Sequence, residues 1–221
     1  MKKIIIVMGL GLLASQTIRA QGITTYLSSI SATSTGNLPV GNDYWLAANF
    51  NTGNNAGGYL LDSIELGMAN ATGSPSGFTV MLYSIADSQE AGLPGNNLAT
   101  LNGSLNPVDE GVYTYTPTSN LTLAASTDYF IVVTAQTAVA DGAYEWSTSA
   151  FFPGSNGWGL SNGILHSSNG TSPWSSGPNP YPYTGIAQFA INATPIPEPS
   201  VLGLLGLGSL LFIRRCRAFK S

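Results

Sequence analysis

The chain has 221 residues, of which 43% are hydrophobic and only 8% are charged, whereas roughly 25% are charged in typical soluble domains. All seven basic residues lie in the first 19 or the last eight positions, and the segment 21–194 contains ten acidic residues but neither Lys nor Arg. Nucleic acids and anionic lipid surfaces are bound through Lys and Arg, so the composition excludes both as partners of this segment.

The first 20 residues have the parts of a secretory signal peptide. Lys2 and Lys3 give a positive start, an apolar run follows at 4–14, and Ala20 is a small residue suited to the cleavage position, with Ala14 as a second candidate. An uncleaved membrane anchor is the alternative, but 11 apolar residues are short against the ~20 that span a bilayer. We therefore expect residues 1–20 to be removed on export.

The segment 21–194 shows the pattern of an all-β domain. Stretches rich in Val, Ile, Tyr, Phe and Thr are separated by turn clusters such as N-T-G-N-N-A-G-G at 51–58. We predict strands at 23–30, 44–49, 60–68, 78–85, 98–102, 111–116, 129–135, 143–147 and 186–191. Short strands at this spacing, without a sustained helical period, predict an antiparallel β-sandwich of jelly-roll type. Cys216 is the single cysteine, so the fold depends on its core and has no intrachain disulfide.

Six segments of this domain carry a resemblance to a described family. They are L-L-D-S-I-E-L (60–66), F-T-V-M-L-Y-S (78–84), L-P-G-N-N-L-A-T-L-N-G-S (93–104), G-V-Y-T-Y-T (111–116), L-A-A-S-T-D-Y-F (123–130) and G-A-Y-E-W (142–146). The span 44–146 resembles the choice-of-anchor surface domains, especially type R. The resemblance implies a bacterial surface β-domain without a known chemistry.

The polar residues do not form a recognisable catalytic or metal-binding pattern. His166 lies in G-I-L-H-S-S-N-G, which is typical of a solvated loop, and the G-x-S-x-G motif of a serine hydrolase is absent. Asp109 and Glu110 are a candidate Ca²⁺ pair, but we expect an exposed turn. Asp62 and Glu65 are three residues apart, which predicts opposite faces of one strand rather than a glycosidase pair. We expect no enzyme activity, no metal and no cofactor.

The segment 151–184 is the most suggestive for ligand binding. Trp158, Trp174, Tyr181 and Tyr183 lie among Gly, Ser, Asn and Pro. Exposed aromatic faces beside amides and hydroxyls would suit sugar rings, so these four residues are the candidate glycan-binding residues. The alternative is that the rings fold back and cap one edge of the sandwich, because large aromatic side chains usually contribute burial.

The segment 195–221 has three parts. The prolines of T-P-I-P-E-P at 194–199 lack amide donors and favour an extended strip. The apolar run 201–213 can form a helix of ~20 Å. Arg214, Arg215 and Arg217 follow, and the positive-inside rule predicts that they remain cytoplasmic. Because 13 apolar residues are short for a permanent span, we expect a temporary hold, with an ordinary tail anchor as the alternative.

Pro197-Glu198-Pro199, the short apolar run and the Arg-rich end resemble the PEP-CTERM sorting signal of Gram-negative bacteria. Ile196 stands where the family pattern often has Val. The resemblance implies that exosortase, a membrane protease-transpeptidase, reads Pro197, Glu198 and Pro199. It also implies a species with an exopolysaccharide-linked surface system.

The sequence thus predicts a signal peptide at 1–20, a β-sandwich surface domain at 21–194 and a sorting signal at 195–221. We expect a secreted, non-enzymatic surface or extracellular-matrix protein that is held only transiently at the inner membrane. The alternative function is a carbohydrate-binding module that recognises exopolysaccharide through the aromatic residues of 151–184. An extracellular hydrolase is the third hypothesis.

Overall fold

A computed structural model describes residues 22–86, 92–151, 157–160, 163–171, 173–176 and 185–198. Within these residues every regular element is a β-strand, and every strand pair is antiparallel. The prediction of an all-β, antiparallel, sandwich-like fold is confirmed. The predicted signal peptide and the apolar run 201–213 lie outside the described residues.

One layer of the sandwich, sheet A, is built around the long strand β4. Its strands are β1 (Thr24–Ser28), β2 (Ser34–Val40), β4 (Tyr59–Gly73), β7 (Gly111–Pro117), β8 (Thr122–Leu123), β10 (Gly142–Ser149), β13 (Ile186–Ala187) and β14 (Phe189–Pro195). One edge of β4 pairs first with β14 and then with β10, and its other edge pairs with β8 and β7. β1 continues the sheet beyond β14, and β2 continues it beyond β10.

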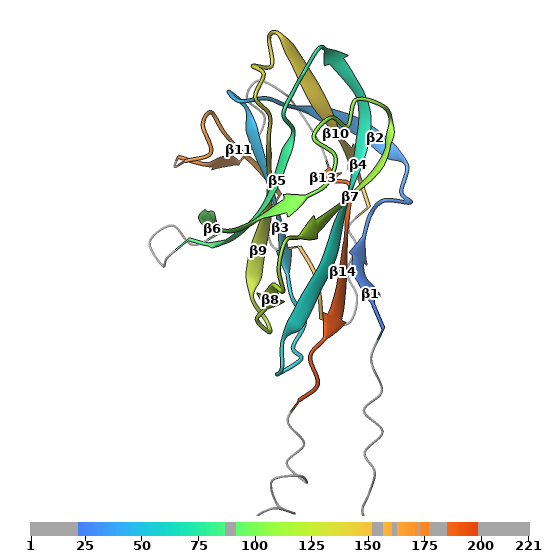
Figure 1. Cartoon of the computed structure of the whole chain (residues 1–221), viewed down its shortest axis with the longest axis vertical. Coiled ribbons are helices and arrows are strands. Elements are labelled where there is room, and N and C mark those ends of the chain that lie inside the picture. Colours follow the sequence, from blue (N-terminus) through green and yellow to red (C-terminus); the bar gives the residue numbers. More distant parts are fainter. Residues whose placement is uncertain are drawn as a thin grey trace, which may run out of the picture.

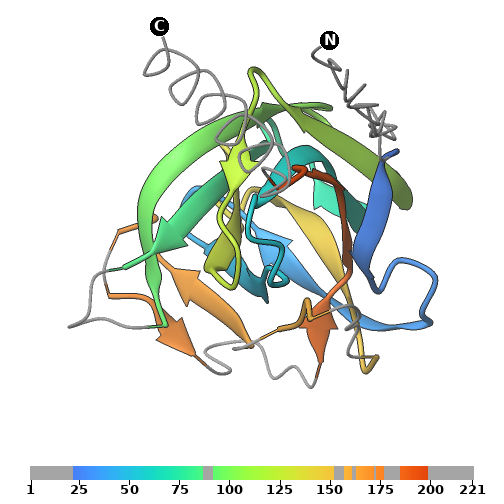
Figure 2. The ribbon, with the colours of Figure 1, turned by 90° about the horizontal axis from the view of Figure 1, so that it is seen from below.

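The second layer, sheet B, faces sheet A across the core (Figure 1). Its strands are β3 (Trp45–Asn51), β5 (Thr79–Ile85), β6 (Pro94–Asn102), β9 (Asp128–Thr134), β11 (Ile164–Ser167) and β12 (Ser175–Ser176). They pair in the order β6-β5-β9-β3-β11-β12, and the end of β6 pairs with β7 and so joins the two layers. Seen from below, the strands curl around a common interior (Figure 2).

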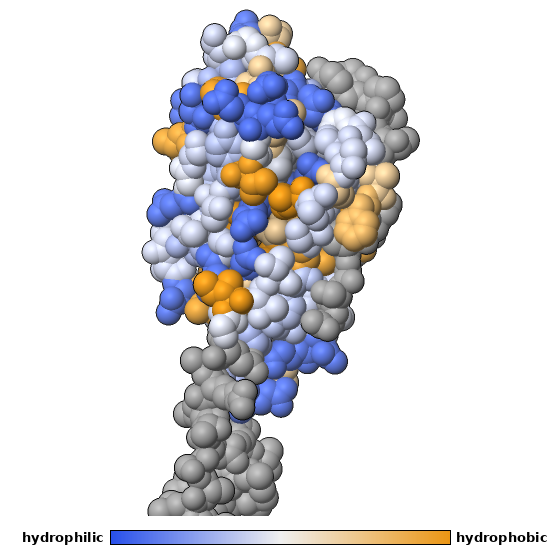
Figure 3. All heavy atoms as spheres, turned by 90° about the vertical axis from the view of Figure 1, so that its right-hand side faces the viewer, coloured by the Kyte–Doolittle hydropathy of each residue, from blue (hydrophilic) through white to orange (hydrophobic). Residues whose placement is uncertain are grey.

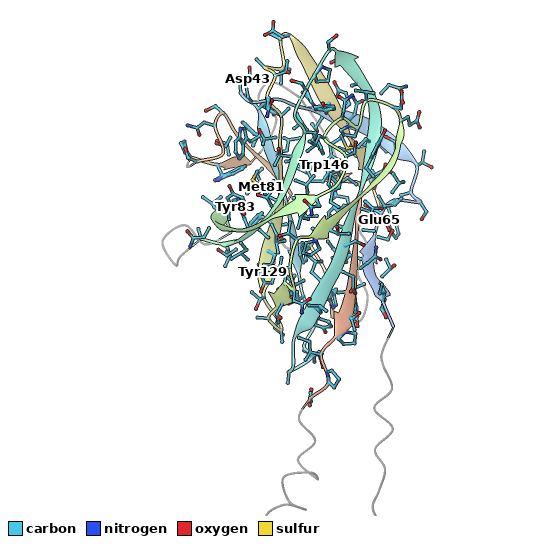
Figure 4. All side chains as sticks on the ribbon, in the orientation of Figure 1. Asp43, Glu65, Met81, Tyr83, Tyr129 and Trp146 are labelled. Atoms are coloured by element: carbon cyan, nitrogen blue, oxygen red, sulfur yellow. The ribbon has the colours of Figure 1, made fainter. Side chains whose placement is uncertain are left out.

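The main hydrophobic core fills the space between the two sheets, because alternate residues of each strand point inward. In β3, for example, Leu46, Ala48 and Phe50 belong to this core. Trp146 of β10 lies between the layers (Figure 4), where its Nε1–H donates to the carbonyl of Gln188 at 2.9 Å. This indole is fully buried, and its hydrogen bond ties β10 to the segment between β13 and β14.

Sheet B also carries a second apolar cluster on its outer face. It contains Ala47, Met81, Phe130, Val132, Leu165 and Trp174. Figure 4 shows Met81 and Tyr83 on the side of β5 that faces away from Trp146. The central strand β9 is consequently buried on both faces, which explains its continuous apolar sequence F-I-V-V at 130–133.

The outer face of sheet A has a different character. Figure 3 looks onto this side of the molecule, where hydrophilic and neutral residues cover most of the surface and apolar residues form separate islands. Glu65 of β4 points outward from this sheet (Figure 4). The one-sided polarity matches an antiparallel sheet with one face on the core and one in water.

All nine predicted strands overlap an observed strand, although the last is divided at Gln188 into β13 and β14. The sequence analysis missed β2, β8, β11 and β12. β2 contains Gly36 and Pro39, two residues that weaken a strand prediction. Pro39 is tolerated because β2 pairs with β10 alone and therefore lies at an edge of the sheet.

The first and last strands of the sandwich are neighbours. Thr24 of β1 pairs with Ala193 of β14, so β1 begins and β14 ends at the same end of the body, at the bottom of Figure 1. The residues that precede β1 and those that follow β14 therefore join the body at this one end.

Candidate sorting site

The strip that follows β14 is held against the body by a loop. β14 ends at Pro195, which pairs with Tyr59 at the start of β4. The Ile196 N–H then donates to the carbonyl of Gly58 at 3.0 Å, and the Asn55 side-chain amide donates to the carbonyl of Ile196 at 2.9 Å. Both backbone polar groups of Ile196 are thus bonded to the loop 55–58.

The next residues of the strip are exposed, yet Glu198 also contacts this loop. The Ala56 N–H donates to Oε1 of Glu198 at 3.3 Å. Pro197 has no amide hydrogen to offer and is exposed. Of the predicted sorting motif, Pro197 and Glu198 are described, whereas Pro199 and the basic residues Arg214, Arg215 and Arg217 lie outside the described residues.

Two glycines allow the strip to lie this close to the loop. A Cβ on Gly57 would lie 2.4 Å from the carbonyl oxygen of Ile196, so any larger residue would force the strip or the loop to move. Gly58 has φ of +74°, a conformation that favours glycine. The turn cluster recognised in the sequence at 51–58 therefore has a second role, which is to bind the strip.

Next to this loop lies a group of four aromatic residues that we call the aromatic floor, namely Tyr26, Phe50, Tyr59 and Trp158. The Trp158 ring stacks on Tyr26 at 4.7 Å and on Phe50 at 6.0 Å between centroids, and it meets Tyr59 edge-on at 4.8 Å. Tyr59 joins the floor to the loop, because its hydroxyl oxygen accepts a hydrogen bond from the Asn55 N–H at 3.2 Å.

Trp158 was predicted as a glycan-binding residue, and the structure places it in the core instead. Only 3% of its surface is exposed, and its ring faces are covered by Tyr26 and Phe50. Its position is fixed by the next residue, since Gly159 exchanges two backbone hydrogen bonds with Asn51 of β3. A sugar ring has no access to this indole, which matches the alternative that the aromatics fold back onto the sandwich.

Trp174 is also buried, with 7% of its surface exposed. It precedes β12 and packs in the outer cluster of sheet B against residues such as Phe130 and Leu165. The structure therefore does not bring Trp158 and Trp174 together into one platform: the first lies in the main core and the second in the outer cluster. Tyr181 and Tyr183, the other two candidates, lie outside the described residues.

His166 does not lie in a solvated loop, so that expectation was wrong. It is part of β11, which pairs with β3 and β12, and its side chain is half-buried. Its imidazole stacks on Tyr44 with 5.2 Å between ring centroids. The short strand was overlooked because Gly, Ser and Asn surround it in the sequence.

The prediction that Asp62 and Glu65 lie on opposite faces of β4 was also wrong. Successive residues of β14 pair with Ser63 and Leu61, so Asp62 is an extra residue in a β-bulge. Leu61 and Ile64 point into the core on either side of the bulge. An extra residue changes the alternation, so an offset of three now keeps Asp62 and Glu65 on the outer face.

Each of these two carboxylates accepts a hydrogen bond from a side chain of β14. The Thr194 hydroxyl donates to Asp62 at 2.8 Å, and the Asn192 amide donates to Glu65 at 3.0 Å. The two acids thereby fasten β14, the strand that leads into the sorting strip, to β4.

A carboxylate that the sequence did not single out lines a surface pocket on sheet A. The pocket has a volume of about 360 Å³ and is lined by Asn37, Pro39, Thr72, Val139, Ala143 and Glu145. The pKa of Glu145 is raised, because burial is the largest effect. Hydrogen bonds to Asn37 and Thr72 act in the opposite direction and are the smaller effects. Glu145 sits between apolar neighbours in β10, which is why its sequence context resembled an ordinary strand.

Asp109 and Glu110 occupy an exposed bend, as predicted. Among the residues that the structure describes, no three His, Cys, Asp or Glu side chains are grouped closely enough to hold a metal ion.

These observations define a β-sandwich body that ends in a loop-held, proline-containing strip. The family model of the PEP-CTERM protein-sorting motif matches residues 195–218, which begin at the last residue of β14. The chain therefore carries a PEP-CTERM sorting motif, and this motif supports export and exosortase-dependent sorting to the cell surface. No curated protein and no solved structure matches the chain. The part of the chain that the structure describes contains no helix able to cross a membrane.

Proposed function

We propose that this chain is a secreted, non-enzymatic surface or extracellular-matrix protein of a Gram-negative bacterium. After export it is held transiently at the inner membrane by the segment 201–213 and is processed by exosortase near Pro197 and Glu198. The body, which we assign to the choice-of-anchor type of surface domain, is then delivered to the outside, where it has a structural or adhesive role.

The observation that carries this proposal is the position of the sorting motif. The motif match begins at Pro195, where the last described strand ends, and Pro197 and Glu198, two of the three residues that exosortase is expected to read, are exposed at one end of the body. Processing there would remove every residue of the apolar run and the basic end while leaving all fourteen described strands intact.

The structure gives less support to the two other hypotheses. Trp158 and Trp174, two of the four residues on which the carbohydrate-binding hypothesis rests, are both buried. A two-carboxylate hydrolase needs two acids that flank the scissile bond of a substrate, whereas the carboxylates of Asp62 and Glu65 are hydrogen-bonded to side chains of β14 and fasten two strands together. A non-enzymatic body is therefore the function that the geometry favours.

Fractionation of the native host tests this proposal. The wild-type protein should be recovered outside the inner membrane, whereas deletion of exosortase or the substitution Glu198→Ala should leave the precursor with that membrane. Glu110→Ala is the matched control, because it removes an exposed glutamate far from the motif. Normal release of the protein without exosortase would refute the proposed route.

A further inference from the structure

The loop 55–58 uses the same groups of the strip that a processing enzyme would need. Enzymes and receptors that bind an extended peptide do so largely through its backbone N–H and C=O groups. In the strip, the N–H and the C=O of Ile196 are already bonded to Gly58 and Asn55. Recognition by an enzyme must therefore compete with the body of the substrate itself.

The charged group of the motif is engaged in the same way. Glu198 carries the only charge of the described strip, and one of its carboxylate oxygens accepts a hydrogen bond from the Ala56 N–H. The carboxylate is exposed to water and the contact is 3.3 Å long, so it is weak and readily broken. The strip is thus docked mainly by a few reversible hydrogen bonds, and only Ile196 is half-buried.

Undocking would also change how far the motif can reach. An extended chain spans ~3.3 Å per residue, so release of the three residues 196–198 from the loop adds about 10 Å of free chain between the body and the segment 201–213. An enzyme at the membrane surface gains access on all sides of the strip only after this release.

We propose that the loop 55–58 is a latch that holds the sorting strip 196–198 against the folded body, and that exosortase acts on the unlatched form. This inference rests on the proposed function, since it concerns how the same motif is presented to its enzyme. The apparent affinity of the enzyme for this substrate is then its affinity for the unlatched form multiplied by the fraction of molecules that are unlatched. Asn55, Ala56 and Gly57 become residues that control processing although they lie about 140 positions before the motif.

The substitution Gly57→Ala tests the latch without changing the motif, because it leaves residues 195–221 unchanged. The new Cβ would lie 2.4 Å from the Ile196 carbonyl oxygen and should expel the strip. Gly57 is not among the glycines with positive φ, so alanine fits its backbone. Gly159→Ala is the matched control, because its Cβ would meet no atom within 4 Å and its φ is likewise not positive.

Two measurements are made on the full chain. Amide hydrogen exchange of precursor purified from cells without exosortase reports the latch directly, because Pro195 and Pro197 have no amide and exchange in the strip comes from Ile196 and Glu198. Pulse-chase conversion of precursor in the native host reports processing. Loss of a single hydrogen bond shifts an equilibrium by roughly two- to tenfold, and expulsion of the strip breaks more than one. Gly57→Ala should therefore accelerate both exchange at Ile196 and conversion by at least this factor.

Asn55→Ala removes a donor to the Ile196 carbonyl and should act in the same direction if Gly57→Ala does not fold. The latch is overturned if Ile196 of the wild-type protein exchanges as an unprotected amide, or if faster exchange in the variants leaves the conversion rate unchanged. Failure of the proposed function looks different, because precursor would then accumulate in the wild type and in every variant, and the latch would fall with it.

Discussion

The sorting strip and the aromatic floor are neighbours, but they are held by different forces. Trp158 and Tyr59 are nearly inaccessible to water and packed ring against ring, whereas Pro197 and Glu198 are exposed and the strip is docked by three hydrogen bonds. Packing of this kind stabilises the body, whereas a strip held by a few hydrogen bonds can be released to another protein. We therefore expect stability and delivery to respond to changes in separate residues, even though Tyr59 and Asn55 link the two regions.

The largest effect on the body should follow from Trp158→Ala. Removing a buried Trp leaves a cavity among Tyr26, Phe50 and Tyr59, and such substitutions cost about 3–5 kcal/mol of unfolding free energy. Denaturant unfolding measures this loss. Phe151→Ala, at an exposed aromatic residue, should change the free energy by no more than about 0.5 kcal/mol. A Trp158→Ala protein of wild-type stability would contradict the burial of this ring and reopen its role in sugar binding.

A smaller effect distinguishes two buried tryptophans. Trp146 Nε1–H donates to the Gln188 carbonyl, whereas no described residue accepts a hydrogen bond from Trp158 Nε1–H. Phenylalanine removes the donor in both cases, so Trp146→Phe should cost about 1 kcal/mol more than Trp158→Phe. Equal losses in denaturant unfolding would show that the hydrogen bond of Trp146 adds nothing to the packing of its ring.

The smallest effect concerns Glu145 and depends on pH. Burial raises the pKa of Glu145 in the folded state, so the folded protein binds this proton more tightly than the unfolded chain. The stability that this proton contributes is present below the unfolded pKa of about 4.3 and is lost as the pH rises through the higher folded value. Glu145→Gln should therefore gain stability relative to the wild type between pH 4 and pH 7. Parallel pH profiles for the two proteins would contradict this assignment.

The sequence predicted the strip better than it predicted the aromatic residues of 151–184. The sorting motif includes three consecutive residues, Pro197, Glu198 and Pro199, so their order can be recognised in the sequence without the fold. Whether Trp158 is exposed depends instead on the bridge between Gly159 and Asn51 and on rings from β1, β3 and β4. Those contacts join residues about 100 or more positions apart, and local composition does not report them.

The sequence pattern located nine strand regions, but it missed four strands and the details of others. The bulge at Asp62 adds one residue to β4 and reverses which face the following polar residues occupy, and nothing in L-L-D-S-I-E-L marks it. Similarly, Gly36 and Pro39 made β2 resemble a turn, because its edge position becomes apparent only when β10 is seen beside it. The latch at 55–58 was read as a turn for the same reason, because its partner, the strip 196–198, lies about 140 positions later in the sequence.

The central claim is that the body is delivered without the apolar run and the basic end. Mass spectrometry of the extracellular protein from the native host tests it most directly. No Lys or Arg occurs at 20–213, so trypsin leaves the body uncut, whereas cleavage after glutamate releases residues 199–221 of the precursor as one peptide. We predict that this Cys216-containing peptide is present in protein from cells without exosortase and absent from the extracellular wild-type protein. Recovery of the peptide from the extracellular protein would contradict the account.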